Sequence, residues 1–142
     1  MSKHILTAVD LGHRDEALKL VKEASRLAGF DNAQIHLVTV LPDYGSSFVG
    51  SFFREGTLKE ASAAALDALH ALADEALAEG QEAQCIVEIG TVYEKTLKTA
   101  KRVEADLIVV GAHKPDLTDR VMGPNAARVS RYADVSVLVL RV

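Results

Sequence analysis

The sequence predicts an α/β fold: a single-domain, doubly wound parallel sheet of five strands with four helices. Short apolar runs alternate along the chain with longer segments of helical periodicity, which is typical of a sheet covered by helices. Two of the runs, "LIVV" at 107–110 and "VLVL" at 137–140, are apolar at every position. Burial on both faces of a parallel sheet requires such runs. The length of 142 residues suits one domain, and we expect it to span residues 1–142.

Each expected strand is a short apolar or β-branched run that ends at turn residues. The first is bounded by Asp10-Leu11-Gly12, and the second stops at Pro42. The segment 42–56 has no clear period and is expected to be a long surface loop. The expected strands are His4–Val9, Gln34–Leu41, Cys85–Ile89, Asp106–Val110 and Val135–Leu140.

The expected helices carry apolar residues at a spacing of three and four. Gly29 is expected to end the first helix and Gly80 the second, while Thr91 is expected to cap the third at its amino end. The alanine-rich composition of the second segment favours a helix. The expected helices are Asp15–Ala28, Leu58–Glu79, Val92–Val103 and Asn125–Tyr132.

Composition limits the functional classes. The formal net charge of −4 argues against nucleic acid as the main partner, which would require a basic surface. No apolar run has the roughly 20 residues of a membrane span, and the first residues lack a signal-peptide core, so we expect a cytoplasmic protein. The one cysteine, Cys85, lies in an apolar run and is expected to be a buried, inert thiol.

The residues that follow the strands are the first place to look for a site, because ligands of such sheets lie beyond the carboxyl ends of the strands. Gly111 follows an apolar run and has no Cβ, so a ligand can approach its backbone closely. Gly123 precedes a short helix, whose first N–H groups are free to bind an anion. These features predict either a phosphate site or an ordinary loop and helix start, and the residues alone do not decide between them.

Several common motifs are missing. The sequence has no Walker A stretch, and "DLGHRD" after the first strand lacks the glycines of a dinucleotide fingerprint. The stretch "GSSFVG" is not a nucleophile elbow, because Val49 replaces the second glycine. The five histidines show no metal-ligand spacing. The third strand ends in Ile89-Gly90, where a phospho-acceptor domain would need an aspartate.

Four stretches occur in order along the chain: "ILTAVD" at 5–10, "IHLVTVLP" at 35–42, "ADLIVVGAHKPD" at 105–116 and "MGPNAARVSRYADVSVLVLRV" at 122–142. Through them, and over nearly its whole length, the chain resembles the universal stress protein family. It implies a Rossmann-like fold of the adenine nucleotide alpha hydrolase type, which agrees with the strand and helix count above. The family has a branch that binds ATP and a branch that does not.

The ATP-binding branch carries a glycine, two residues, a glycine, nine residues, then glycine and Ser/Thr. Here Gly111 matches the first glycine and Gly123 the third, but Lys114 stands at the second glycine position. Eight residues separate Lys114 from Gly123, and Pro124 replaces the Ser/Thr, which removes an N–H and a hydroxyl. This shortened form is similar to a sub-branch that is thought to bind ATP.

The resemblance implies a site for ATP, ADP or AMP, with Mg²⁺ as a possible accompanying ion. In the binding branch the residue matching Asp10 contacts ribose, and the backbone of the residue matching Val40 contacts adenine. The residues alone also allow Asp10 to be a turn or cap residue, and Val40 to be ordinary core. The implied nucleotide-binding residues are Ala8, Val9, Asp10, Val40, Gly111, His113, Lys114, Gly123, Pro124, Asn125 and Ala126.

Two functions from different classes follow. The first is a regulatory protein of the stress response that acts as a nucleotide-dependent switch and contacts a further protein partner. No general base stands beside a metal-binding carboxylate pair, so we expect at most slow ATP hydrolysis and no dedicated catalytic residue. The second is a dimeric interaction protein that binds no nucleotide, which Lys114 and Pro124 favour. The resemblance implies a homodimer that pairs its last strands in antiparallel fashion.

Overall fold

A computed structural model gives the fold of the chain and describes residues 3–42, 55–112 and 124–142. Within these ranges the chain forms five strands and four helices in strict alternation, which confirms the predicted α/β class. The elements are β1 (His4–Ala8), α1 (Arg14–Asp31), β2 (Gln34–Leu41), α2 (Glu55–Ala76), β3 (Ala83–Ile89), α3 (Val92–Arg102), β4 (Leu107–Ala112), α4 (Pro124–Tyr132) and β5 (Ser136–Arg141).

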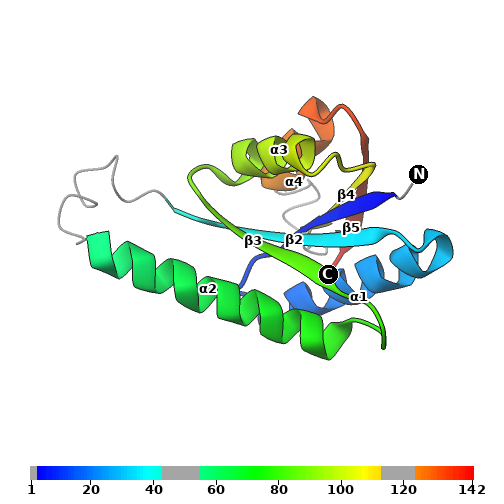
Figure 1. Cartoon of the computed structure of the whole chain (residues 1–142). Helices are drawn as coiled ribbons and strands as arrows, with labels where there is room; N and C mark the ends of the chain where they lie inside the picture. The colour runs from blue at the N-terminus through cyan, green and yellow to red at the C-terminus, as the bar shows by residue number, and fades with distance from the viewer. Residues whose placement is uncertain (1–2, 43–54, 113–123) are drawn as a thin grey trace, which may run out of the picture.

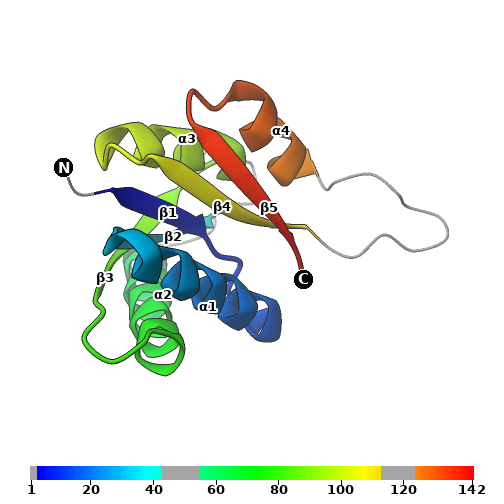
Figure 2. The same cartoon turned by 90° about the vertical axis from the view of Figure 1, so that its right-hand side faces the viewer.

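All strands are parallel, and the sheet order is β3-β2-β1-β4-β5 (Figures 1 and 2). The chain therefore moves outward from β1 to β2 and β3, then returns to the other side of β1 to add β4 and β5. The strand order reverses between β1 and β4. In open α/β sheets this reversal leaves a crevice at the carboxyl ends of the two strands.

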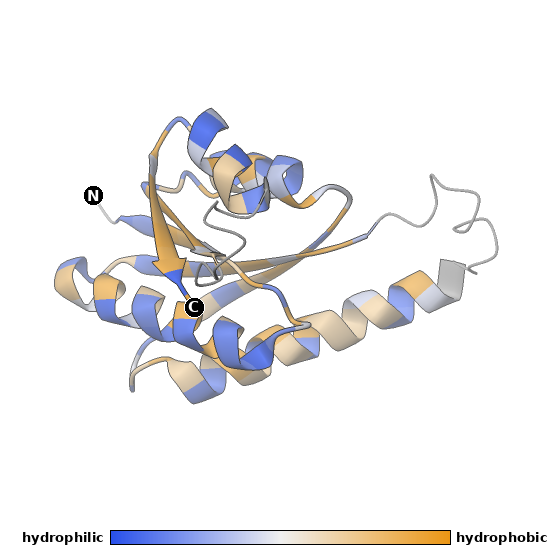
Figure 3. Cartoon of the chain, turned by 180° about the vertical axis from the view of Figure 1, so that it is seen from behind, coloured by the Kyte–Doolittle hydropathy of each residue, from blue (hydrophilic) through white to orange (hydrophobic). Residues whose placement is uncertain are grey.

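Helices cover the sheet on both faces. Figures 1 and 2 show α1 and α2 on one face and α3 and α4 on the other. Two separate clusters of buried side chains correspond to these faces. Successive residues of β1 show the alternation: Leu6 packs in the cluster under α3 and α4, while Ile5 packs in the cluster under α1 and α2. Figure 3 shows the apolar strands between helices of mixed polarity, as expected for a two-sided core.

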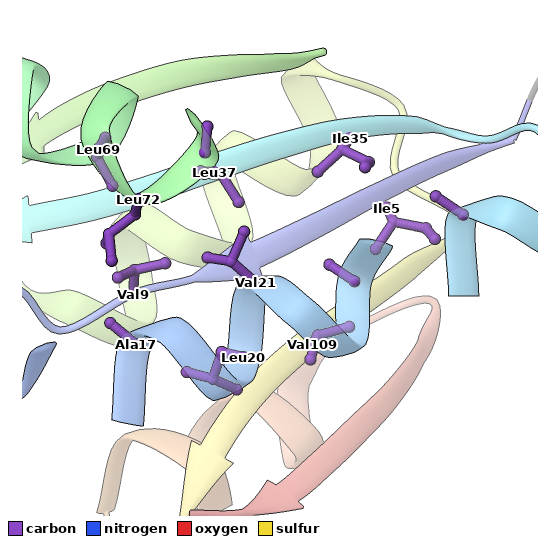
Figure 4. Close-up of a cluster of buried hydrophobic side chains, with 13 residues drawn as sticks. Ile5, Val9, Ala17, Leu20, Val21, Ile35, Leu37, Leu69, Leu72 and Val109 are labelled. Carbon is purple, nitrogen blue, oxygen red and sulfur yellow. The ribbon is translucent and has the colours of Figure 1, made fainter. Parts of the chain in front are cut away.

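The cluster under α1 and α2 illustrates how helical spacing builds the core (Figure 4). Along α1, Ala17, Leu20, Val21, Ala24 and Ala28 are all buried, and their positions fall on one face of the helix. They meet Ile5, Ile35 and Leu37 from the strands and Leu69 from α2. Full burial of a leucine or valine side chain stabilises the fold by about 1.5–3 kcal/mol.

Two helix ends differ from the sequence prediction. Gly29 does not end α1, which continues to Asp31, and Asn32 then takes a left-handed conformation with φ 52° and donates its N–H to the Ala28 carbonyl. Asparagine tolerates this conformation well, so it replaces glycine as the helix stop. The second helix ends at Ala76 rather than Glu79, and Gly80, with φ 85°, lies in the turn beyond it.

Smaller boundary differences concern the strands. Gly111 was expected to follow its strand, but it lies inside β4 and pairs in register with Leu140 of β5. Most of the segment 42–56 that was expected to be a loop lies outside the described residues, and α2 already begins at Glu55. No helix among the described residues is long and apolar enough to span a membrane.

Cys85 is half-buried on β3, and burial raises the pKa of its thiol, with the nearby carboxylate of Asp74 acting in the same direction. A raised pKa keeps the thiol protonated and therefore weakly nucleophilic. The raised pKa agrees with the expectation of an inert thiol, but Cys85 is half-buried rather than buried as expected.

A polar ladder crosses three strands on the α3 and α4 face of the sheet. His36 of β2 lies between His4 of β1 and Gln84 of β3, with 2.9 Å between His4 Nδ1 and His36 Nε2 and 2.7 Å between His36 Nδ1 and Gln84 Oε1. The two imidazole rings are stacked with centroids 5.2 Å apart. With His36 Nδ1 donating to Gln84, the neutral His36 accepts at Nε2 from His4, so the ladder is satisfied when His36 carries no charge.

We predict that His36 makes the fold less stable in mild acid. Burial lowers the pKa of His36, the Gln84 hydrogen bond opposes this, and His4 lowers it further. In the unfolded chain His36 is protonated with a pKa of about 6.5, whereas in the folded chain its pKa is lower. The contribution of neutral His36 to the free energy of unfolding is therefore full above that pH and decreases as the pH falls below it. Urea unfolding between about pH 7 and pH 5 measures the effect.

His36→Gln is the matched variant, because glutamine also offers a donor and an acceptor but does not titrate. The stability of this variant is expected to change less across the same pH range. Equal losses of stability in both proteins would show that other groups cause the acid sensitivity.

Candidate functional site

A cavity of about 430 Å³ opens at the carboxyl ends of β1, β2 and β4, where the strand order reverses. The strand ends supply its floor, α1 supplies the wall on one face of the sheet, and α3 and α4 supply the wall on the other face. The cavity therefore lies where the fold alone places a ligand site. Its volume is within the range of about 300–1,000 Å³ that is usual for small-molecule sites.

The cavity brings together every predicted site residue whose side chain the structure describes. These residues, which come from three strand ends and the first turn of α4, are Ala8, Val9, Asp10, Val40, Gly111, Asn125 and Ala126. Pro124 is the first residue of α4 and immediately precedes this group. His113, Lys114 and Gly123 lie outside the described residues.

Asp10 has a structural role that is visible directly. Its Oδ1 accepts a hydrogen bond of 2.8 Å from the backbone N–H of Gly12, and its Oδ2 lies 3.9 Å from Nε2 of His13. A Cβ at Gly12 would lie 3.1 Å from the same Oδ1, so the glycine leaves room for the carboxylate. The turn reading of Asp10 is therefore correct. The side chain is 73% exposed and lies on the cavity, so the turn fixes a carboxylate that a ligand can still reach.

Gly111 is surrounded differently from what the sequence suggested. A Cβ added there would lie 3.1 Å from Cδ1 of Leu20, a buried α1 side chain that also lines the cavity. The absence of a side chain at residue 111 thus makes room first for Leu20. A larger residue would move Leu20, and the cavity wall with it.

Sequence reasoning missed the residues that α1 and α3 contribute to the two walls of the cavity. Glu16, Ala17 and Leu20 contribute from α1, while Val92 and Thr96 contribute from α3. Their positions do not follow a strand, so the rule that led to the strand ends cannot find them. A signal was present in the sequence for α3 only: a threonine at position 96 interrupts the apolar side of an otherwise amphipathic helix.

Thr96 is the polar residue buried most deeply in this wall. Its relative exposure is 0%, and its hydroxyl Oγ1 has no hydrogen-bond partner among the residues that the structure describes. Thr39 of β2 lines the cavity as well and is 4% exposed.

The charges on the described part of the cavity are negative. Asp10 and Glu16 are the charged side chains there, and both lie towards α1. The remaining described residues are mostly apolar, above all towards α3 and α4. Arg128 of α4 does not line the cavity; its guanidinium carbon lies 5.2 Å from the centroid of the Tyr93 ring.

A second hollow of about 420 Å³ lies between the end of α2 and the start of β3, and His70, Asp74 and Gln81 contribute to its lining. It is near the amino end of β3, away from the reversal in strand order. None of the predicted site residues lines it. The cavity at the strand ends is therefore the candidate site.

A model of the universal stress protein family matches residues 1–141. The chain belongs to this family. Among curated proteins it is similar to universal stress protein G of Shigella flexneri, with 29% identity over 99% of this chain and 100% of the relative. The likeness therefore covers all four stretches on which the resemblance rests.

Solved structures agree with the fold. This universal stress protein is similar to a universal stress protein in complex with cAMP, with a TM-score of 0.68, 23% identity and coverage of 97% of this chain and 95% of the other. It is also similar to the Archaeoglobus fulgidus protein in complex with dAMP, with a TM-score of 0.67, 21% identity and coverage of 98% of both chains. At this identity the likeness establishes the fold.

We predict that Gly111→Val destabilises the protein by about 1–3 kcal/mol, because the new side chain overpacks the space that Leu20 fills. Urea unfolding measures the loss. In a Leu20→Ala background, which creates room at the same place, the valine is expected to cost less. If the two changes are additive, Leu20 is not the residue that requires glycine here.

Proposed function

We propose that this universal stress protein binds an adenine nucleotide (ATP, ADP or AMP) in the strand-end cavity and acts as a nucleotide-dependent switch in the stress response. The observation that carries the proposal is the cavity itself. It lies at the reversal in strand order. The residues that the sequence predicts for the site come from three strand ends and one helix, and those whose side chains the structure describes all line this cavity.

The two ends of the cavity suit the two ends of a nucleoside. Val40 of β2 and Val92 of α3 offer an apolar surface for a flat base. On the α1 side, Asp10 offers a carboxylate that can accept hydrogen bonds from ribose hydroxyls. Solved relatives of the same fold carry cAMP and dAMP, and both ligands contain adenine.

The phosphates would extend from the ribose towards the start of α4. The described end of that path is the first turn of the helix, where the N–H groups of Asn125 and Ala126 are suited to an anion. The proposal gives His113, Lys114 and Gly123 the remaining phosphate contacts. Pro124 has no N–H, so it contributes none from its backbone.

Mg²⁺ would be coordinated at the site mainly by the phosphates of the nucleotide. Among the described residues, no three His, Cys, Asp or Glu side chains lie close enough to hold a metal ion. Mg²⁺ commonly binds through substrate phosphates with one or two carboxylates. Asp10 and Glu16 are the carboxylates on the described cavity wall. We propose a binding protein with at most slow hydrolysis.

The second candidate is a dimeric interaction protein that works without nucleotide, and β5 is the observation that favours it. Among the described strands β5 lies at the edge of the sheet and pairs only with β4, and its apolar side chains from Val137 to Leu140 are only half-buried. An apolar edge strand invites pairing with another strand. The two candidates are compatible, because the nucleotide and the edge strand use different surfaces. In a switch, bound nucleotide would alter the pairing of the edge strands or the contact with a further protein partner.

We predict that the wild-type protein binds ATP and AMP in calorimetric titrations and that Asp10→Ala weakens both by about tenfold or more, because a carboxylate bond to ribose is worth about 1.5–3 kcal/mol. Asp10→Asn is the matched control, because its amide oxygen can keep the Gly12 turn while the charge is lost. A wild-type protein that binds neither nucleotide contradicts the proposal. Equal binding by wild type and Asp10→Ala would contradict the ribose assignment.

We predict that Val139→Pro shifts the protein from dimer to monomer. Val142 donates its N–H to Ala112 of β4, and N–H groups alternate in direction along a strand. The N–H of Val139 therefore faces the free edge of β5, and proline removes it without removing a donor to β4. Leu138→Pro is the contrasting change, since it removes a donor to β4 and is expected to destabilise the fold. Light scattering measures the mass; a monomeric wild type would overturn the dimer.

A further inference from the structure

We propose that the exposed surface of α3 and α4 binds an acidic segment of a partner protein through two tyrosines and two arginines. We call this group the tyrosine–arginine strip, and it consists of Arg128, Tyr93, Tyr132 and Arg131. The inference gives the further protein partner of the proposed function a binding surface and a chemistry. It does not require that the cavity bind a nucleotide.

The first argument is the arrangement of the strip, in which Tyr93 belongs to α3 and the other three residues to α4. The guanidinium carbon of Arg128 lies 5.2 Å from the centroid of the Tyr93 ring, and that of Arg131 lies 5.6 Å from the centroid of the Tyr132 ring. The two ring centroids are 6.3 Å apart. A cation within about 6 Å of a ring centroid is attracted to the ring face. The two rings therefore hold both guanidinium groups in place at the surface.

The second argument is that neither guanidinium group has a carboxylate partner within the described ranges of the chain. Three other arginines do have one: Arg14, Arg26 and Arg102 pair with Glu75, Glu23 and Glu88 respectively. Arginine presents its N–H donors as a planar fork that matches a carboxylate. Stacking on a ring leaves the donors at the edge of the fork available, so a carboxylate from another molecule can bind them.

The third argument is the division of charge between the two helix layers of a chain whose net charge is −4. Helices α3 and α4 carry one acidic residue, Glu94, and six basic residues, which are Lys95, Lys98, Lys101, Arg102, Arg128 and Arg131. Ion pairs with Asp134 and Glu88 involve only two of the six. On the opposite face of the sheet (Figure 1), the described side chains of α2 include one basic residue, Lys59, and four acidic ones, which are Glu60, Asp67, Asp74 and Glu75. The surface around the strip therefore favours an acidic partner.

The residue types of the strip favour a protein as this partner. Tyrosine and arginine are enriched at the centres of protein–protein interfaces, where they contribute much of the binding energy. Tyr132 is 56% exposed and offers its ring to an apolar side chain of the partner. A nucleic acid matches less well, because its closely spaced negative charges would be repelled by the net negative charge of this chain.

A second copy of the chain is the other acidic candidate, because α2 could bring its carboxylates to the strip. However, α2 and the strip lie on opposite faces of the sheet (Figure 1). Contact between them would be head-to-tail, which builds open chains of molecules unless the rotation closes a ring. The expected partner is therefore a different protein, with a segment that places an apolar side chain between carboxylates.

The experiment titrates the chain, in the absence of nucleotide, with a short synthetic peptide of glutamate and leucine. The same peptide with glutamine in place of glutamate tests the need for carboxylates, and oligothymidylate tests binding to nucleic acid. The double variant Arg128→Gln, Arg131→Gln removes both charges of the strip. Arg26→Gln is the matched control, because Arg26 also lies over an exposed ring, 5.7 Å from the centroid of Phe30, but belongs to α1 and is paired with Glu23.

The double variant is expected to bind the glutamate peptide about tenfold more weakly than the wild type, because two charge pairs with the peptide are lost. Arg26→Gln is expected to keep the wild-type affinity, and the glutamine peptide to bind the wild type about tenfold more weakly than the glutamate peptide. Since both arginines are exposed, the double variant is expected to keep the circular dichroism spectrum and the unfolding midpoint of the wild type.

Failure of the wild type to bind the glutamate peptide would overturn the proposal, as would an equal loss of affinity in Arg26→Gln. Tighter binding of oligothymidylate than of the glutamate peptide would assign the surface to nucleic acid instead. A salt-dependent increase in mass by light scattering that the double variant abolishes would assign it to α2 of a second copy. Because no nucleotide is present, none of these results bears on the proposed nucleotide site, which the titrations with ATP and AMP test separately.

Discussion

The parallel pairing of β1 with β2 on one side and β4 on the other is the constraint on which the rest of the molecule depends. Because both neighbours and both covering layers are present, Leu6 and Thr7, which face opposite sides of the strand, are each fully buried. The same pairing forces the chain to leave β1 in one direction and return in the other. The connections therefore diverge above its carboxyl end, and the cavity is the space between them.

Polarity changes across this cavity because its two walls belong to different layers. The α1 wall brings Glu16 beside the turn that fixes Asp10, while the α3 and α4 wall continues the apolar cluster around Val110 and Val129. A ligand with one apolar end and one hydroxyl-rich end matches this change without rearrangement of the sheet. The same arrangement leaves the hydroxyl of Thr96 buried and without a partner among the described residues.

The fold and the strand-end residues could be predicted because both follow from local sequence. Consecutive apolar residues in β4 and β5 indicate strands buried on both faces, and the residues after each strand must meet at one edge of the sheet. Leu20 and Thr96 could not be found this way, because their place depends on how α1 and α3 rotate about their axes when they pack. The prediction that Gly29 ends the first helix was wrong for a related reason. Ala28 packs in the core, and α1 ends only where Asn32 takes a left-handed conformation.

The division of the cavity between strand ends and helix walls has an evolutionary consequence. Residues of the strand ends are held by the sheet register, so a substitution there disturbs pairing as well as ligand contact. Residues of α1 and α3 that reach the cavity can change while the sheet stays intact. Ligand preference within this architecture can therefore diverge through the helices, and two members with the same strand-end residues need not select the same ligand.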